Sequence, residues 1–335
     1  SPGASAGAQD NGSDAVRWSN TDPAAVQWNV RLGGDGIYTR IEPVNEQRWY
    51  FSSQNGNLVV SQTGPTGSTT SANSGWGGDT LSFVMPIEIY RYGALDVAGS
   101  GCSSSIGCSY MLGGTNRVWE TLLGGIPSSS WYANSPNLTK GTLSDRSFIN
   151  QLAHATKTPS VVIAGTNDGN VQVGFGMNQG TAGSASWVNL TAANAVLPNR
   201  PVMDVAIDVA DAANPAASAT GYAALGGFDQ NTPATPGHVY QVSCQNSCAT
   251  FSWRNVSGNL PNIPVNAIAV NPNMPNQVFA GSDWGLYYTD DVSAASPVWY
   301  RFENGLPRVM IWDMAIDRGF STLAVFTRGR GAWAW

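Results

Sequence analysis

The chain has 335 residues, of which 11% are charged, and its formal net charge is −6. Phosphate binding needs a basic face, so this balance argues against a nucleic-acid partner. The apolar runs fall short of the roughly 18–20 residues of a membrane span, so the sequence predicts no such span.

One unit recurs along the chain and is clearest between Val265 and Trp299. Two strand-forming runs, VNAIAVNP and NQVFAGS, precede the turn Asp283-Trp284-Gly285 and a third run, LYYTDD. A sheet this small can bury its faces only against copies of itself. Its hairpin can be found seven times, with turns at Asp10, Asn55, Asn116, Asp168, Asp229, Asp283 and Arg328.

Seven copies in 335 residues correspond to about 48 residues each, which is typical of a propeller blade. We therefore predict an all-β fold, a seven-bladed β-propeller of three- to four-stranded antiparallel blades, as a single domain over residues 1–335. No segment indicates a helix. Four turn glycines should have positive φ, with every hairpin tip on one face: Gly12, Gly56, Gly169 and Gly285.

In chain order, a strand at 26–30 ends the first unit, and residues 33–43 open the second. A Gly/Ser/Thr linker at 64–78 precedes a strand at 81–89, which Pro86 interrupts. The fourth unit opens at 148–155. The first strands of the last three units are expected at 202–209, 265–272 and 310–317.

Thirteen tryptophans are many for this length. We interpret those that recur at one blade position as packing residues: Trp28, Trp131, Trp187, Trp253 and Trp299. Trp76 and Trp284 lie in loops outside this pattern. Each of the two either packs its loop or presents an aromatic face to a sugar or a partner.

The four cysteines form two close pairs, Cys102/Cys108 and Cys244/Cys248, each inside a polar loop. Neither spacing is that of a zinc knuckle, a redox motif or a haem attachment site. We expect two local disulfides, which indicate an oxidising compartment and a secreted or cell-surface protein. The alternative is four free thiols in the cytosol.

Several motifs resemble those of the BNR, or Asp-box, β-propellers of the sortilin and xyloglucanase-like superfamily. They are GAQDNGS, LGGDGIYTRIEP, FSSQNGNLVVS, IAGTNDGNVQV, LPNRPVMDVAID, LPNIPVNAIAVNPNMPNQVFAGSDWGLYYTDD and FTRGRGAWAW. The resemblance extends from Gly7 to Trp335. Within the superfamily, the motifs are most similar to those of large secreted bacterial glycosyl-hydrolase BNR-repeat proteins. The Asp box S/T-x-D-x-G-x-T-W has decayed here, because residues 289–293 lack its glycine and residues 61–64 lack its aspartate.

The resemblance raises the possibility of glycoside hydrolysis, which needs two carboxylates about 5–9.5 Å apart. Asp10 or Asp35 is the candidate for the catalytic acid/base, although turn geometry alone also selects Asp before Gly. Xyloglucanase-type enzymes place one catalytic carboxylate in each of two propellers, and neither catalytic segment can be matched here. Candidate ligand-binding residues at the other tips are Asp168, Asp229, Asp283, Trp284, Arg328 and Arg330.

Metal and cofactor sites are not expected. His154 and His238 lie far apart in the sequence, with no carboxylate or cysteine at ligand spacing. The run 10–14 resembles the start of a calcium loop but lacks the downstream glutamate. No phosphate-binding loop or nucleophile elbow is present.

Two functions remain open. The favoured one is a non-catalytic extracellular propeller that binds a glycan or a protein on its loop face; the alternative is a glycoside hydrolase fragment. The first unit begins inside a hairpin and the last lacks an outer strand. We therefore expect a C-terminal part of a longer precursor, with an upstream segment or another chain completing the terminal blades.

Overall fold

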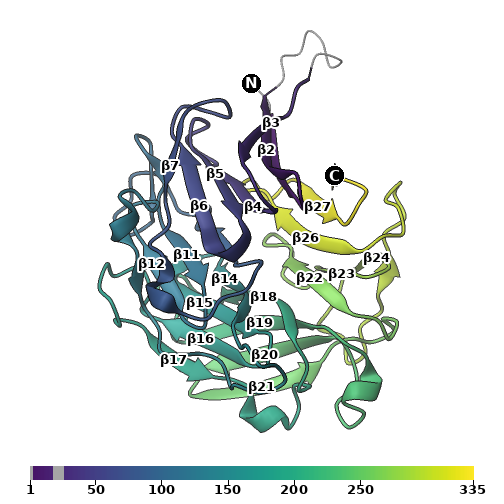
Figure 1. The fold of residues 1–335 in the computed structure, drawn as a ribbon. Helices are drawn as coiled ribbons and strands as arrows, with labels where there is room; N and C mark the ends of the chain where they lie inside the picture. The colour runs from purple at the N-terminus through teal and green to yellow at the C-terminus, as the bar shows by residue number, and fades with distance from the viewer. Residues whose placement is uncertain (1–2, 18–25) are drawn as a thin grey trace. The chain divides into compact units, whose positions relative to one another are not determined.

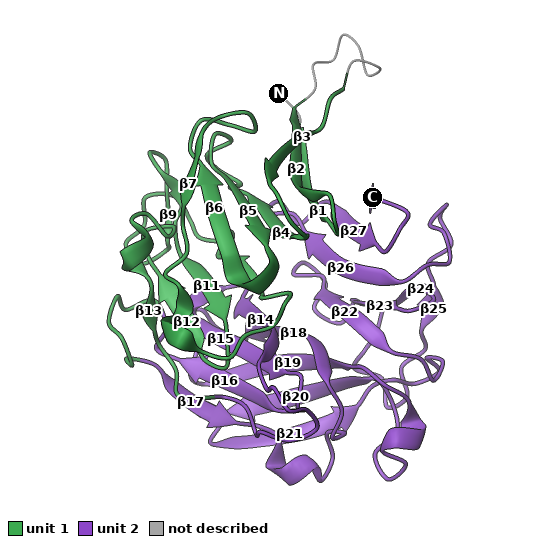
Figure 2. Cartoon of the chain, viewed as in Figure 1, with its two compact units in different colours: residues 1–137, 178–184 green, residues 138–177, 185–335 purple. Residues whose placement is uncertain are grey.

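The computed structural model describes residues 3–17 and 26–335 and consists of β-sheets (Figure 1). Seven antiparallel sheets of three or four strands form the blades of a β-propeller, which confirms the predicted fold class. Among the described residues the helical segments are 3₁₀ turns of three residues. None of the helices described is long and apolar enough to cross a membrane. The chain divides into two compact units (Figure 2).

Unit 1 comprises residues 1–137 and 178–184 and contains three blades. The strands of the first blade are β1 (Gly3–Ala8), β2 (Gly12–Arg17) and β3 (Asn29–Leu32). Those of the second are β4 (Gly36–Ile41), β5 (Trp49–Ser53), β6 (Asn57–Ser61) and β7 (Thr69–Ser71). The third contains β8 (Ile87–Ile89), β11 (Met111–Gly114), β12 (Val118–Thr121) and β13 (Tyr132–Ala133). A separate ribbon pairs β9 (Cys102–Ser103) with β10 (Gly107–Cys108).

Unit 2 comprises residues 138–177 and 185–335 and contains four blades. The fourth blade has β14 (Ile149–Ala155), β15 (Thr158–Thr166), β16 (Val171–Phe175) and β17 (Ser186–Asn189). The fifth has β18 (Val202–Val209), β19 (Ser218–Leu225), β20 (Val239–Gln245) and β21 (Thr250–Asn255). The sixth has β22 (Val265–Val270), β23 (Val278–Ser282), β24 (Gly285–Thr289) and β25 (Tyr300–Arg301). The last has β26 (Ile311–Ile316), β27 (Leu323–Thr327) and β28 (Ala332–Ala334).

Within each unit the hydrophobic core lies between successive blades. In unit 2, one buried cluster joins the fourth blade to the fifth, and two more join the fifth to the sixth and the sixth to the last. Second strands are apolar on both faces, as β15 and β19 show by being almost wholly buried at their C-terminal ends. A second strand covered on both faces has no solvent side, which is why its sequence does not alternate.

A glycine in the second strand marks the close approach of the next blade. An added Cβ at Gly165 would lie 2.4 Å from a Val202 side-chain carbon, and one at Gly281 would lie 2.6 Å from Ile311. Gly7 in β1 lies equally close to β4, the first strand of the second blade. An added Cβ at Gly7 would lie within 2.5 Å of backbone atoms of Gly36 and Ile37. The recurrent Ala-Gly before each of these hairpins is therefore a packing requirement between blades.

Tryptophans in or beside the outer strands hydrogen-bond to the preceding blade. The indole N–H of Trp131 donates to the Ala72 carbonyl at 2.6 Å, and that of Trp299 to Val256 at 2.9 Å. Trp253 makes the equivalent bond to Leu190 at 2.6 Å. Each acceptor directly follows an outer strand, so these tryptophans join neighbouring blades. Trp28 departs from the predicted packing role, because it precedes an exposed segment of β3 and is 52% exposed.

Two expectations about the second and third blades are corrected. The linker at 64–78 contains β7, which is the outer strand of the second blade. The strand expected at 81–89 is confined to β8, after Pro86, because proline has no N–H to offer a sheet. Trp76 is buried, donates its indole N–H to the Gly56 carbonyl at 2.8 Å and packs against Trp131, so it is a loop-packing residue.

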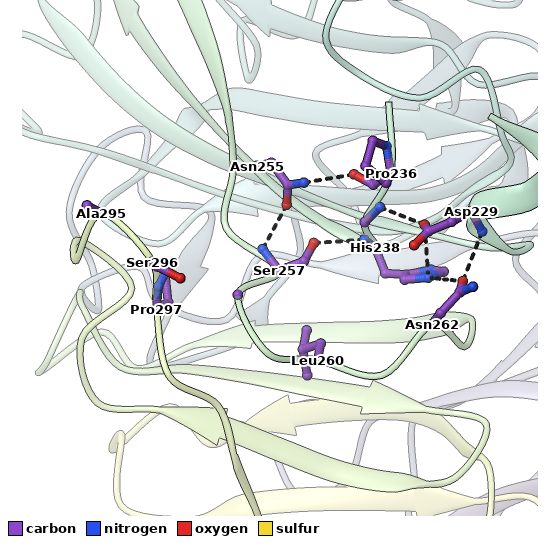
Figure 3. Close-up of a pocket in the computed structure, with 12 residues that line it drawn as sticks. Asp229, Pro236, His238, Asn255, Ser257, Leu260, Asn262, Ala295, Ser296 and Pro297 are labelled. Carbon is purple, nitrogen blue, oxygen red and sulfur yellow. Dashed lines mark hydrogen bonds and ion pairs between the residues drawn. The ribbon is translucent and has the colours of Figure 1, made fainter. Parts of the chain in front are cut away.

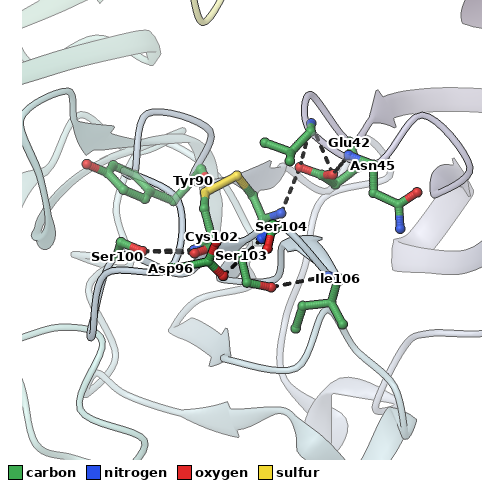
Figure 4. The surroundings of a disulfide bond; sticks show 11 residues. Glu42, Asn45, Tyr90, Asp96, Ser100, Cys102, Ser103, Ser104 and Ile106 are labelled. Carbon is green, nitrogen blue, oxygen red and sulfur yellow. Dashed lines mark hydrogen bonds between the residues drawn. A yellow bond between two sulfur atoms is a disulfide. The ribbon is translucent and has the colours of Figure 1, made fainter.

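Both predicted disulfides are present and leave no free cysteine among the described residues. Cys102–Cys108 closes the β9–β10 ribbon, and the buried Glu42 carboxylate anchors it by accepting the Cys108 N–H at 2.7 Å (Figure 4). Cys244–Cys248 closes the turn between β20 and β21.

The predicted turn geometry is also confirmed. Gly12, Gly56, Gly169 and Gly285 have φ between 70° and 107°. Within each unit, hairpin tips hydrogen-bond to the loop that opens the next blade. The Asn55 N–H donates to the Phe83 carbonyl in unit 1, and the Asp229 N–H donates to the Asn262 side chain in unit 2. These contacts place the tips and the blade-opening loops at one edge of each unit.

Candidate functional site

A cavity of about 360 Å³ opens at the hairpin-tip edge of the fifth blade in unit 2 (Figure 3). Three loops form it: the long β19–β20 hairpin loop, the β21–β22 loop and the β24–β25 loop. Its lining is predominantly polar and consists of Asp229, Pro236, Gly237, His238, Asn255, Ser257, Gly258, Leu260, Asn262, Ala295, Ser296 and Pro297.

The β19–β20 loop is longer than the other tips and contains two prolines, Pro233 and Pro236. A 3₁₀ turn begins at Asp229, and its carboxylate Oδ1 accepts the Gly237 N–H at 2.7 Å across the neck of the loop. Gly237 has φ of 106°, which favours glycine. The loop therefore projects outward as an ordered arch, and the Asp229 side chain remains about 30% exposed at the cavity wall.

His238 lies where the arch returns to β20 and bridges two loops. Its Nε2 is 3.1 Å from Asn262 Oδ1 and 3.5 Å from Asp229 Oδ1. The Asn262 Oδ1 also accepts the Asp229 N–H at 2.9 Å, so its oxygen assignment is fixed by a backbone donor. Nδ1 in turn lies 3.4 Å from the Leu225 carbonyl, so acceptors face both ring nitrogens. A neutral imidazole has one N–H, and the two acceptors at Nε2 favour that nitrogen as its position.

Burial lowers the pKa of His238, and the Arg200 guanidinium lowers it further. The hydrogen bond to Asn262 Oδ1, the Asp229 carboxylate and the Leu225 carbonyl raise the pKa but do not outweigh these effects. The imidazole is thus neutral at neutral pH.

Arg200 supports the loop from below. It is 2% exposed, donates from Nη2 to the Gly237 carbonyl and places that nitrogen 3.7 Å from Asp229 Oδ1. Burial lowers the pKa of its guanidinium, which nevertheless remains charged. The positive charge offsets that of Asp229. Burial raises the pKa of Tyr240 to about 12. The Arg200 charge acts to lower this pKa and the Asp229 charge acts to raise it.

The remaining walls are held by backbone contacts. The Ser257 hydroxyl accepts the His238 N–H at 2.8 Å and the Val239 N–H at 3.0 Å. Asn255 donates from Nδ2 to the Pro236 carbonyl at 2.7 Å. Ser296 is exposed on the β24–β25 loop, opposite these residues in Figure 3. The cavity thus has a fixed polar wall on two loops and an accessible hydroxyl on the third.

The two predicted catalytic aspartates lie together in unit 1. The Asp10 N–H donates to Asp35 Oδ1 at 2.9 Å, and the Asp35 N–H donates to Gln54 Oε1 at 2.9 Å. Asp10 is at the β1–β2 tip with φ of 63°. The Asp35 carboxylate therefore ties a hairpin tip to the loop that opens the second blade, which is a structural use of the group.

Asp168 is fully buried at the fourth blade tip. Its Oδ2 accepts the N–H groups of Lys140 and Gly141, both at 2.7 Å, and its Oδ1 accepts the Thr166 hydroxyl. With no exposed surface, this carboxylate is placed to hold the loop in position.

Asp283 is exposed at the sixth tip and accepts the Asn266 amide at 2.9 Å. Trp284 beside it is 59% exposed, and its carbonyl accepts Arg301 Nη2. Arg328 stacks over the exposed Trp312 ring at 5.8 Å, and Arg330 is exposed at the same tip. These side chains line exposed tips and lie outside the cavity.

Of the predicted ligand-binding residues, the cavity therefore contains Asp229. Sequence reasoning missed His238 and Asn262. A usable signal was present, because Asn262 belongs to LPNIPV, which repeats the earlier LPNRPV, and His238 follows the one tip loop that is markedly longer. Within 3–17 and 26–335, no group of three or more metal-ligating side chains is placed to hold a metal ion.

Comparison with known proteins shows the fold. No protein-family description matches the chain, and no curated protein matches it. Among solved structures, it is similar to the crystal structure of the WD40 β-propeller domain of Doa1, with a TM-score of 0.58 and 8% sequence identity. The match covers 98% of this chain and 87% of that one. At this identity the likeness establishes a β-propeller, while membership of the BNR superfamily stays a prediction.

Proposed function

We propose that this protein is a non-catalytic extracellular β-propeller that binds a glycan or protein partner at the hairpin-tip edge of unit 2. The observation that carries the proposal is the cavity at the fifth blade. It is concave, its walls are joined by hydrogen bonds, and its polar lining consists of amides, hydroxyls, one imidazole and one carboxylate. Such a lining orients a ligand without supplying reactive groups.

The same lining argues against hydrolysis in the cavity. Glycoside hydrolysis needs two carboxylates across the scissile bond, and Asp229 is the one carboxylate among the lining residues that the structure describes. The neutral His238 and the hydrogen-bonded Ser257 do not form a nucleophile–base pair, since the Ser257 hydroxyl accepts two backbone N–H groups.

The alternative is a glycoside hydrolase fragment that uses Asp10 and Asp35. One observation favours it. The Asp35 Oδ1 lies 2.9 Å from the backbone nitrogen of Asp10, so the two residues are neighbours in the structure. Release of reducing sugar from polysaccharides that is lost in both Asp10→Asn and Asp35→Asn would favour this function over binding.

The extracellular assignment rests on the two disulfides, because such bonds persist mainly in oxidising compartments. Non-reducing mass mapping of native material tests it. Free thiols at Cys102 and Cys108 would contradict secretion.

A blocking substitution tests the site. Ala295 is exposed at the cavity rim, so Ala295→Trp should fill the opening without disturbing a core. Ala212→Trp is the matched control, in an exposed loop between β18 and β19 at the other end of the strands. Ligands from glycan and peptide arrays should lose at least tenfold in affinity with Ala295→Trp and be unchanged with Ala212→Trp. Equal binding by both variants would remove the cavity from the proposal.

We also propose that a strand from another segment or another chain adds to the last blade. The last blade has three strands where the other blades of unit 2 have four, and within the described part of the chain β28 pairs with β27 alone. An exposed strand edge is a site for β-addition by an upstream segment or another chain. Native mass spectrometry that found a soluble 35.3 kDa monomer with no copurifying peptide would contradict this.

A further inference from the structure

The proposed binding function leaves the chemistry of the ligand open, and the charges around the cavity restrict it. We propose that the cavity binds an uncharged sugar unit at the end of a glycan. This inference rests on the proposed function and assigns its ligand class. Three features support it: the charge balance, the unused hydrogen-bonding atoms and the size of the cavity.

The charge balance disfavours ionic ligands. Asp229 is the one acidic residue in the lining, and the Arg200 guanidinium lies 3.7 Å from its Oδ1. His238 is neutral, because burial lowers its pKa. A cationic ligand would meet a carboxylate whose charge is already offset. An anionic ligand would find no lysine or arginine among the described residues of the lining.

The unused hydrogen-bonding capacity matches hydroxyl groups. Asp229 Oδ1 accepts Gly237, but Oδ2 has no partner among the described residues. The Nδ2 of Asn262 donates one bond, to Gln230, and the Nδ2 of Asn255 donates one, to Pro236, so each amide retains a second N–H. A hydroxyl can donate to the carboxylate and accept from an amide at the same time, as neighbouring hydroxyls of a sugar ring do.

The third loop adds a group that can both donate and accept. The Ser296 hydroxyl has no hydrogen bond to any residue that the structure describes, and in Figure 3 Ser296 lies on the other side of Ser257 from Asp229 and Asn262. Pro236, Leu260 and Pro297 supply the apolar contacts that the C–H faces of a ring require. A volume of about 360 Å³ lies near the lower limit of small-molecule sites, so it suits one terminal unit rather than a long chain.

The test compares arrays of neutral, amino, and sialylated or sulfated glycans, followed by calorimetry with the best ligand. We expect neutral glycans to bind. Ser296→Ala removes one hydrogen bond and should weaken binding about 3- to 10-fold. Asp229→Asn keeps the side-chain shape but replaces an accepting oxygen, and should weaken it at least about 10-fold. Asp283→Asn, at the exposed sixth tip, is the matched control and should leave affinity unchanged. Thermal melts confirm that each variant is folded.

The outcomes separate the two proposals. If only charged glycans or only peptides bind, and Ala295→Trp abolishes that binding, the neutral-sugar inference is wrong while the binding function stands. If neutral glycans bind but Ser296→Ala and Asp229→Asn match the wild type, the assignment of the cavity is overturned. If no ligand of any class is sensitive to Ala295→Trp, both proposals fail.

Discussion

The fourth and fifth blades of unit 2 carry an aspartate at the same hairpin tip, yet the two carboxylates are used differently. Asp168 in the fourth blade is fully buried and accepts three hydrogen bonds from its own loop and the loop that opens the blade. Asp229 in the fifth blade is partly exposed and borders the cavity. The same turn residue therefore closes one tip and lines an opening at the next.

The neighbouring loops explain the difference. The next blade presents an asparagine to each tip, Asn199 from LPNRPV and Asn262 from LPNIPV. At the fourth tip, Lys140 Nζ donates to Asn199 at 2.7 Å and to Asn194 at 2.8 Å, so a long side chain fills the space. At the fifth tip, the Asp229 N–H and His238 contact Asn262 instead. Among the described residues that line the cavity there is no lysine to fill the space beside Asp229, and the space remains open.

The largest expected effect comes from removing the buried carboxylate. Asp168→Ala leaves the N–H groups of Lys140 and Gly141 and the Thr166 hydroxyl without the buried acceptor they share, and should cost about 2–4 kcal/mol in the free energy of unfolding. Asp229→Ala should cost less. Asp283→Ala, at an exposed tip, should change the free energy of unfolding by no more than about 0.5 kcal/mol. Urea denaturation of the three variants measures the order. A cost for Asp283→Ala equal to that for Asp168→Ala would contradict the assignment of a closing role to Asp168.

The second effect tests the packing between these two blades. Gly165→Val should cost about 1–3 kcal/mol, because the added Cβ lies 2.4 Å from the Val202 side chain of β18. Gly33→Ala is the control, since an added Cβ there has no atom within 4 Å. Thermal melts should show a clear decrease for the first variant only. Unchanged stability in Gly165→Val would mean that the blades separate freely at this point.

The repeated features of the molecule were predictable from sequence, and the cavity was not. Strands, turns and the glycines with positive φ follow from local patterns such as IAGTNDG and FAGSDWG, because hairpin geometry is decided by a few adjacent residues. The cavity depends on the conformation of the 226–238 loop. That loop is held by tertiary contacts of Arg200, His238 and Asn262, which are far apart in the sequence.

Surface exposure was predicted least well, for the same reason. Trp76 and Trp284 both lie in loops that contain glycine, yet one is 3% and the other 59% exposed. Trp76 is buried because the β5–β6 tip of the second blade supplies the Gly56 carbonyl, and Trp119 and Trp131 of the third blade supply aromatic neighbours. No local pattern distinguishes the two residues.

A third, smaller effect concerns the other end of the fifth blade. Cys244 and Cys248 are four residues apart, so their disulfide constrains a short loop in the unfolded chain. The double variant Cys244→Ser, Cys248→Ser should cost about 1–2 kcal/mol, at the low end of disulfide effects. Because the bond lies at the opposite end of the strands from the tip, ligand affinity at the cavity should not change. Calorimetry that showed a marked loss of affinity would connect the two ends of the blade.

The smallest expected effect is the pH dependence that distinguishes the open tip from the closed one. The pKa of His238 is below its usual value of 6.5, because burial and Arg200 disfavour the imidazolium. As pH falls through 6.5, the unfolded chain therefore binds a proton before the folded chain does, and stability decreases until the folded pKa is passed. Above pH 6.5 both states are neutral at this residue, and its contribution is constant.

Melting temperatures between pH 8 and pH 5.5 should thus decrease at the acid end in the wild type. His238→Gln keeps an N–H that can reach Asn262 and Asp229 but cannot be protonated, so its profile should be flatter. The closed fourth tip offers the control. Burial lowers the pKa of Lys140 from its ordinary value of 10.5. Lys140→Gln should nevertheless leave the dependence of melting temperature on pH unchanged between pH 8 and pH 5.5. If His238→Gln and the wild type lose stability in parallel, the acid sensitivity arises elsewhere, and His238 is not the titrating group of the cavity.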